Sequence, residues 1–417
     1  MKKFLHLILI FVSLLSFAQN RNEIGSQFIK TLFTDKNMEK AHAFFDPSMG
    51  GQVSPEDLKS LEEQLEGQLG ELKNILEVNN EKDTYYFYSD FSKTKLDIQI
   101  TFNESNKIVG FYFVPHKFFD KTDDKTVLKI KSEGIDLNGI LLQPEQNNKK
   151  KLVILVHGSG PQDRDETIGE NKPFKDIAEY LLKNGISSYR YDKRTYSNPE
   201  TFNDQSTVEQ ETINDAVNIS NYFKNNENFK GYQIIVLGHS QGAYLMPKIA
   251  EKANASKYIF MAGNARPLQN LLVEQFEYLH KIDPSKVSDQ DVQNIKKQVD
   301  FLNSNKFNLN TPKSELPLEQ SAAYWKYLVD YKPLEAIKSI KAPMFFAQGG
   351  RDYQVTEKDF ELWKNQLKNN KSTEFKFYPS LSHLFIKGSG TPSPKDYEIK
   401  GNVDEEFLKD LTQFILK

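Results

Sequence analysis

The stretch that decides the fold reads Ile234-Ile235-Val236-Leu237-Gly238-His239-Ser240-Gln241-Gly242 and leads into residues with helical character. Its apolar half is typical of a strand that is buried on both faces. Its second half has the G-x-S-x-G spacing, in which side chains at positions 238 and 242 would collide with neighbouring backbone. The combination predicts a sharp turn from strand to helix that lifts the Ser240 hydroxyl clear of the sheet. We therefore expect Ser240 to be a nucleophile.

A nucleophilic serine needs a base, and the base needs an acid that orients it. The chain has seven histidines, and position along the chain eliminates all but His383, which follows the last expected core strand. The acid is expected at the end of a strand between the serine and the histidine. Asp352 meets this condition, because it follows an apolar run and two glycines, while Asp330 and Glu335 are weaker substitutes. The order serine, aspartate, histidine differs from that of chymotrypsin and subtilisin.

Negative charge develops on the carbonyl oxygen during such an attack, and backbone N–H groups are fixed partners for it. Gln241 begins the helix after the serine, so its N–H is the first expected donor. The second donor is expected from the small-residue turn His157-Gly158-Ser159-Gly160, which follows another apolar strand. The N–H of Ser159 is favoured, and that of Gly160 is the alternative.

The segment 124–417 alternates apolar strands with helices, which predicts a mostly parallel sheet with helices on both faces. Between the strands expected at 258–261 and 344–347, residues 267–335 carry helical stripes. This connection is far longer than a plain crossover helix, so we expect an inserted helical cap over the site. Extra helix packed elsewhere on the surface is the alternative. Aromatic residues in this segment, among them Tyr324 and Trp325, give only weak support for an apolar pocket.

The pattern over residues 23–115 predicts a small α+β domain. Its acidic, basic and potential metal-binding residues do not form a cluster that could be assembled into a site. Leucines spaced by three or four residues, from Leu58 through Leu72 to Leu76, predict a helix, and later apolar residues alternate as in strands. A polar connection is expected at 118–125. Ligand binding, shading of the active site and formation of a homodimer are the roles open to this domain.

The first eighteen residues resemble a secretory signal. Lys2 and Lys3 precede an apolar run over 4–17, and Ser16-Phe17-Ala18 offers small residues for cleavage before Gln19. A retained membrane anchor is the alternative, but the run is shorter than the roughly 20 residues of a spanning helix. We expect an exported protein, periplasmic or extracellular, without stable membrane insertion after cleavage.

The composition of the chain argues against several kinds of partner and site. The formal net charge of −3 becomes more negative once Lys2 and Lys3 are removed, which does not suggest a nucleic-acid or anionic-membrane partner. The chain has no cysteine, which excludes disulfides, thiolate metal sites and a cysteine nucleophile. The acids in Asp163-Arg164-Asp165-Glu166 suggest a metal site, but no histidine stands at ligand spacing, so a charge-paired loop is preferred. We expect no metal and no cofactor. Asp192, Arg194 and Arg266 are expected to brace loops through ion pairs.

The chain from about Asp124 to Lys417 resembles the α/β-hydrolase superfamily. The resemblance narrows to dienelactone-hydrolase-like and acyl-CoA-thioesterase-related serine esterases through His157-Gly158-Ser159-Gly160-Pro161-Gln162-Asp163-Arg164-Asp165-Glu166, Tyr191-Asp192-Lys193-Arg194 and Ala262-Gly263-Asn264-Ala265-Arg266-Pro267. True dienelactone hydrolases differ, because they use cysteine at the position of Ser240. Residues 23–115 are similar to the small NTF2-like (DUF3887-type) domain that often precedes such hydrolases.

These observations together predict an exported serine hydrolase that cleaves small carboxylic esters through an acyl-enzyme. The catalytic residues are expected to be Ser240, Asp352 and His383, with Gln241 and Ser159 as oxyanion donors. An aminopeptidase or acyl-peptide hydrolase, or a thioesterase, would use the same triad. A binding protein without catalytic activity is a further alternative. The sequence does not identify the substrate, because the expected pocket depends on how cap residues are oriented.

Overall fold

The computed structural model describes residues 21–114, 116–117 and 126–417. The expected signal peptide at 1–18 and the polar connection expected at 118–125 lie outside these residues. The chain divides into two compact units, one ending at Lys121 and the other beginning at Thr122. Within the described residues, no helix combines the length and the apolar character needed to cross a membrane.

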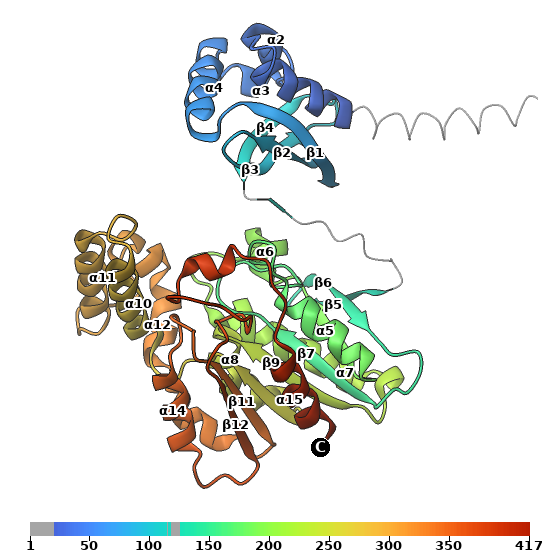
Figure 1. The fold of residues 1–417 in the computed structure, drawn as a ribbon, viewed down its shortest axis with the longest axis vertical. Coiled ribbons are helices and arrows are strands. Elements are labelled where there is room, and N and C mark those ends of the chain that lie inside the picture. The colour runs from blue at the N-terminus through green and yellow to red at the C-terminus, as the bar shows by residue number, and fades with distance from the viewer. Residues whose placement is uncertain (1–20, 115, 118–125) are drawn as a thin grey trace, which may run out of the picture. The chain divides into compact units, whose positions relative to one another are not determined.

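The first unit packs helices against a four-stranded antiparallel sheet (Figure 1). A helix over residues 21–33 comes first. The other elements are α2 (Met38–His42), α3 (Pro47–Gly50), α4 (Pro55–Leu69), β1 (Leu72–Glu81), β2 (Thr84–Phe91), β3 (Lys95–Phe102) and β4 (Ile108–Val114). Phe28, Phe87 and Ile98 are fully buried between the helices and the sheet. The unit therefore has its own hydrophobic core.

The helix expected to reach Leu76 is shorter than the leucine spacing predicts. It ends at Leu69, because Gly70 takes a positive φ of 80° and donates its N–H to the carbonyl of Glu66. Leu72 and Leu76 then belong to β1, which pairs with β2. The helical expectation was wrong at these two positions, since the glycine and the strand pairing outweigh the spacing.

The second unit is built on an eight-stranded sheet of order β12-β11-β10-β9-β7-β8-β6-β5. The strands are β5 (Val127–Ser132), β6 (Ile135–Leu142), β7 (Lys151–Val156), β8 (Ser187–Tyr191), β9 (Gln233–His239), β10 (Lys257–Met261), β11 (Met344–Gly349) and β12 (Thr373–Tyr378). Strands β7 to β12 run parallel, and β5 and β6 are added as an antiparallel pair. The predicted mostly parallel sheet is confirmed.

Both faces of this sheet are buried. In β7, Leu152 and Ile154 belong to one hydrophobic core, whereas Val153 and Leu155 belong to the other. The second core is formed with α5 (Pro173–Lys183) and α15 (Glu405–Leu416). The first core is formed with α7 (Asn214–Asn225), α9 (Met246–Ala253) and α14 (Glu357–Gln366). These layers hold the carboxyl ends of the parallel strands in one row.

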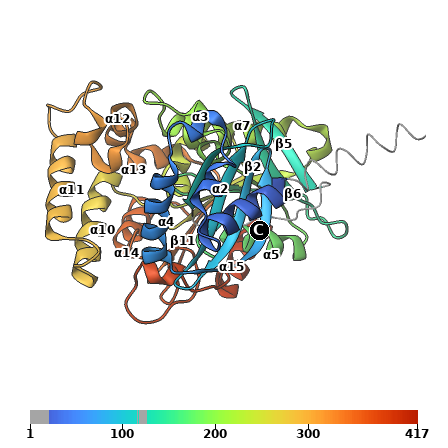
Figure 2. The same cartoon turned by 90° about the horizontal axis from the view of Figure 1, so that it is seen from above.

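Helices also fill the long connection between β10 and β11. They are α10 (Leu268–Ile282), α11 (Asp289–Leu302), α12 (Ala322–Asp330) and α13 (Pro333–Ala336). The helices α10, α11 and α12 lie together beside the sheet in both views (Figure 1, Figure 2). Trp325 and Leu328 of α12 are buried in the same core as α7 and α9. This packing joins the inserted helices to the body of the unit.

Close backbone packing fixes the turn after β9. A Cβ atom on Gly238 would collide with the backbone of Gly242, and a Cβ atom on Gly242 would collide with the carbonyl oxygen of Val156. The short helix α8 (Gln241–Tyr244) follows, and Pro247 stands in the first turn of α9 rather than inside one continuous helix. The two glycines therefore let the turn lie directly against the end of β7.

We predict that Gly242→Ala destabilises the second unit by more than about 3 kcal/mol, because an added methyl group meets rigid backbone. Gly231→Ala, in the same unit, is the control, since a Cβ atom on Gly231 meets open space and only its positive φ of 81° opposes the substitution. Its expected cost is about 1–2 kcal/mol from backbone conformation alone. Both tryptophans, Trp325 and Trp363, are buried in the second unit, so urea unfolding followed by their fluorescence reports this unit. Equal costs for the two variants would contradict the argument.

Candidate active site

Ser240 occupies the turn between β9 and α8 in a strained backbone conformation. Its φ of 50° and ψ of −112° are unusual for a residue other than glycine. The turn is held by hydrogen bonds from the Ser240 N–H to the Met261 carbonyl, at 2.9 Å, and from the Tyr244 N–H to the Ser240 carbonyl, at 2.8 Å. Ser240 lines a cavity of about 530 Å³. The structure thus places the expected nucleophile at the wall of a cavity.

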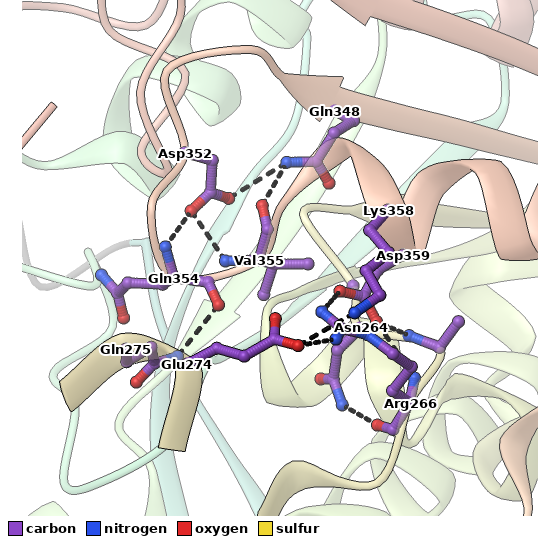
Figure 3. Close-up of polar contacts among 12 residues, drawn as sticks. Asn264, Arg266, Glu274, Gln275, Gln348, Asp352, Gln354, Val355, Lys358 and Asp359 are labelled. Carbon is purple, nitrogen blue, oxygen red and sulfur yellow. Dashed lines mark hydrogen bonds and ion pairs between the residues drawn. The ribbon is translucent and has the colours of Figure 1, made fainter. Parts of the chain in front are cut away.

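Asp352 and His383 lie in hydrogen-bond contact, as the sequence predicts for the acid and the base. Nδ1 of His383 is 2.6 Å from Oδ2 of Asp352, and both side chains are buried. The other carboxylate oxygen accepts the N–H groups of Gln354 and Val355, each at 2.9 Å (Figure 3). Gln348 donates its side-chain amide to Oδ2. The carboxylate is therefore held as an acceptor, so Nδ1 carries the proton and Nε2 is left as the basic nitrogen.

The loop of His383 also touches the turn that carries Ser240. Nε2 of His239, the residue before Ser240, lies 2.9 Å from the carbonyl oxygen of His383. Among the described residues, no hydrogen bond joins the Ser240 hydroxyl to the His383 ring. Catalytic hydrogen bonds are often long before substrate binds and tighten in the complex. The structure therefore brings together two members of the predicted triad and places the third next to the loop of the base.

The expected oxyanion donors lie on either side of Ser240. Ser159, Gly160 and Gln241 all line the same cavity as Ser240. Within the described part of the chain, none of their three backbone N–H groups donates to a protein acceptor. A Cβ atom on Gly158 would lie only 3.3 Å from Cβ of Ser240. The glycine turn therefore passes close to the nucleophile, and both Ser159 and Gly160 stay open as the second donor.

Sequence reasoning missed a buried pair formed by Glu166 and His239. Oε2 of Glu166 lies 2.9 Å from Nδ1 of His239, and Oε1 accepts the N–H of Gly158 at 2.6 Å. Glu166 has a positive φ of 54°, a strained conformation for this residue type. Burial alone would lower the pKa of His239, but the charge and contact of Glu166, the carbonyl of His383 and the charge of Asp352 together outweigh burial and raise that pKa. The pair links the glycine turn to the loop of His383.

Burial and the neighbouring groups also have opposite effects on the pKa of Glu166. Burial would raise the pKa of its carboxyl, but the charge and contact of His239, the charge of His157 and the N–H of Gly158 together outweigh burial and lower that pKa. Local sequence patterns could not predict this contact, because 73 residues separate Glu166 from His239 along the chain. The expectation that Glu166 belongs to a charge-paired loop is confirmed by its contact with His239.

A second buried network is centred on Lys193, which contacts the segments on either side of Ser240. Its Nζ atom lies 2.8 Å from Oε1 of Glu211, 2.8 Å from the carbonyl oxygen of Gly158 and 3.2 Å from Oε1 of Gln241. Glu211 belongs to one turn of π-helix, η3 (Glu209–Ile213), a local irregularity often found at functional sites. Tyr324 of α12 donates its hydroxyl to Oε2 of Glu211 at 2.7 Å. No periodic pattern in the sequence could have predicted this cluster.

The cavity is lined by both apolar and polar side chains. Its apolar lining comes mainly from the inserted helices and includes Leu268, Leu271, Leu272, Leu318 and Trp325. Its polar lining includes Glu211, Gln241 and Tyr324, which are joined by hydrogen bonds through the Tyr324 hydroxyl. Tyr324 and Trp325 thus line the pocket that their position in the expected cap suggested. The inserted helices therefore shape the space in front of Ser240.

The remaining charged residues form ion pairs around the site. The contacts are Arg164–Asp192 at 2.6 Å, Arg190–Asp165 at 2.6 Å, Arg194–Asp215 at 2.5 Å and Arg266–Asp359 at 2.7 Å. These contacts confirm the expected bracing role of Asp192, Arg194 and Arg266. Figure 3 shows Arg266 held by Asp359 and Glu274 close to the loop of Asp352. Across 21–114, 116–117 and 126–417, no group of three potential ligands is placed to hold a metal ion.

The substitutes considered for the acid lie on the surface. Asp330 pairs with Lys326, and Glu335 pairs with Lys338. Both carboxylates are mostly exposed. Asp352 is therefore the acid that contacts His383.

Comparison with known proteins adds independent information on both units. Residues 26–111 match a family described as a protein of unknown function (DUF3887), and residues 147–388 match one described as serine aminopeptidase, S33. Esterase EstD of Thermotoga maritima is 31% identical over 399 residues, which cover 92% of this chain and 93% of the relative. The solved esterase Pf2001 of Pyrococcus furiosus is 18% identical, with a TM-score of 0.47, over 72% of this chain and 95% of that protein. Proline iminopeptidase of Mycobacterium smegmatis is 15% identical, with a TM-score of 0.46, over 69% of this chain and 97% of that protein.

We predict that His157, at the end of β7, makes stability depend on pH. Burial lowers the pKa of this histidine from 6.5 to about 4. Between these values the unfolded chain binds a proton that the folded chain does not, so the free energy of unfolding falls as the pH falls. The loss amounts to about 3 kcal/mol. Urea unfolding of wild type and His157→Gln from pH 4 to 7 isolates this contribution as a difference between two curves. If the free energies of unfolding of the two proteins change in parallel with pH, the predicted contribution of His157 is refuted.

Proposed function

This chain belongs to the α/β-hydrolase superfamily, and on that premise we propose that it hydrolyses carboxylic esters with Ser240 as nucleophile, His383 as base and Asp352 as orienting acid. The proposal combines the expected triad with the esterase relative that matches most of the chain. The observation that carries it is the 2.6 Å contact between Nδ1 of His383 and Oδ2 of Asp352, with Ser240 held in a strained turn at the cavity wall. A small ester is the expected substrate.

In the proposed reaction, Nε2 of His383 takes the proton of the Ser240 hydroxyl while Oγ attacks the ester carbonyl. The carbonyl electrons move to oxygen, where the backbone N–H groups of Gln241 and Ser159 stabilise the negative charge. Collapse of this intermediate expels the alcohol, which receives the proton from His383. Water then attacks the acyl-enzyme by the same route and releases the acid. Asp352 stabilises the imidazolium and keeps the ring in the required tautomer.

An aminopeptidase is the second candidate, because the matching family is described as a serine aminopeptidase and the cavity contains the carboxylate of Glu211. A carboxylate could hold the ammonium group of a peptide substrate. Here Lys193 lies 2.8 Å from Glu211 and Tyr324 donates to its other oxygen. The negative charge is already compensated by a buried cation, which favours a neutral ester over a substrate with a free amine.

We predict that Ser240→Ala lowers kcat/KM for a nitrophenyl ester by at least about 10⁴-fold, since removing the nucleophile disables the triad as a unit. The same variant should lose labelling by a fluorophosphonate probe, which wild type shows. Ser256→Ala, an exposed serine before β10, is the matched control and should retain wild-type rates. Normal esterase activity in Ser240→Ala would refute the proposed mechanism.

The same two proteins distinguish the ester, thioester and amide alternatives. Wild type and Ser240→Ala are assayed on nitrophenyl esters of rising chain length, an acyl thioester and an aminoacyl-nitroanilide. We expect the largest kcat/KM for the esters, because compensation of Glu211 leaves no net charge for an ammonium group. A preference for the anilide would favour the aminopeptidase, and a preference for the thioester would favour a thioesterase. Failure of the probe to label Ser240 in the folded protein would favour a binding protein.

We also propose that the protein is exported, periplasmic or extracellular. The support is the sequence alone: Lys2 and Lys3 before the apolar run 4–17, with small residues at Ser16-Phe17-Ala18. Expression of the full chain in a bacterial host, followed by cell fractionation and mass spectrometry of the mature protein, tests this. We expect a chain that begins at Gln19 outside the cytoplasm. An uncleaved chain in the cytoplasmic fraction would refute the proposal.

A further inference from the structure

Lys193 follows β8 in the motif Tyr191-Asp192-Lys193-Arg194, and the mechanism above does not use it. Its side chain is buried, with only 1% of the residue exposed. The side chain of its neighbour Arg194 forms ion pairs with Asp215 and Glu133. Lys193 instead turns to Gly158, Gln241 and Glu211. Two of these three partners belong to the segments that supply the proposed oxyanion donors.

The contact with Gly158 bears directly on one donor. The carbonyl of Gly158 and the N–H of Ser159 belong to the same planar trans peptide, so they point in opposite directions. Nζ of Lys193 donates to this carbonyl at 2.8 Å. Holding the carbonyl on one side directs the Ser159 N–H to the other side, and Ser159 lines the cavity. A cation on the carbonyl also polarises the peptide, which strengthens its N–H as a donor.

The contact with Gln241 bears on the other donor. Oε1 of Gln241 accepts from Lys193 at 3.2 Å, and Nε2 donates to the Tyr324 hydroxyl at 2.7 Å. The side chain is therefore fixed at both ends. Because Gln241 begins α8 and lines the cavity beside Ser240, fixing its side chain also restrains its backbone N–H.

We propose that Lys193 is a positioning residue for the oxyanion hole: its buried ammonium lies behind both donor segments, orients them and adds positive potential where negative charge develops. The proposal rests on the ester hydrolysis proposed above. Glu211 balances the ammonium in the resting protein, so the cation can stay buried. Fixed positive charge in a dry site stabilises the transition state more than the ground state. Loss of Lys193 should therefore lower kcat rather than weaken substrate binding.

Lys193→Met tests this by removing the charge and keeping most of the side-chain volume. We expect kcat for a nitrophenyl ester to fall about 10- to 100-fold, below the effect of deleting a direct donor, with KM within about 3-fold of wild type. The second readout is inhibition by a trifluoromethyl ketone. Ser240 adds to its carbonyl, its proton passes to His383, and the carbonyl electrons become an oxyanion in the hole. The inhibition constant should rise by the same factor as kcat falls.

The single variant leaves Glu211 buried without its cation, which is strongly destabilising. Lys193→Met/Glu211→Gln is therefore measured alongside, because it removes both charges. Since Glu211 lines the cavity, KM can change in this double variant, and kcat and the inhibitor decide. A folded double variant that still shows the low kcat supports the proposal. Wild-type kcat and inhibitor affinity in that variant would overturn it.

Lys257→Met is the matched control for loss of a buried ammonium. Lys257 begins β10, at the opposite end of the strand from the site, and donates to the carbonyls of Phe414 and Ile415. This variant should lose stability but keep kcat. If Lys193→Met changes only stability and KM, as a structural lysine would, the proposal fails while ester hydrolysis stands. Absence of turnover in wild type, or turnover in Ser240→Ala, would instead refute the proposed function.

Discussion

The close approach of the β9–α8 turn to the end of β7 is the constraint on which the site depends. Gly242 packs against the carbonyls of Val156 and His157, which leaves no room for a side chain. The same approach brings the next residue of that segment, Gly158, alongside Ser240. Ser240, the proposed nucleophile, and the Gly158 turn, the proposed source of an oxyanion donor, are thus positioned by one backbone contact. The strain at Ser240 is maintained because rigid strands on both sides hold the turn.

Charges at this edge of the sheet are buried as matched pairs. Asp352 with His383, Glu166 with His239, and Lys193 with Glu211 each bring opposite or complementary groups to within 3 Å. Burying such pairs rarely adds stability, because desolvation offsets the attraction between them. Their common feature is that each one holds a segment that reaches Ser240. Placement of those segments, rather than stability, is the physical reason we infer for retaining them.

The elbow, the acid and the base could be predicted because each follows from local spacing and from the order of strands along the chain. The Glu166–His239 and Lys193–Glu211 contacts could not, since they join loops that only the folded sheet brings together. Glu211 also lies in a turn of π-helix, where the periodicity of an α-helix does not predict which way a side chain points. The error at Leu72 and Leu76 has a different cause: their spacing was helical, but Gly70 and pairing with β2 determined the structure.

One ion pair serves two requirements that are usually treated separately. Toward the cavity, Lys193 compensates the Glu211 carboxylate, which would otherwise attract an ammonium group of a substrate. Toward the turn, it holds the Gly158 carbonyl and the Gln241 side chain. Under the roles proposed above, selection against amine substrates and support of the oxyanion donors depend on the same charge. The proposal therefore predicts that removing the charge of Lys193 changes substrate preference and rate together.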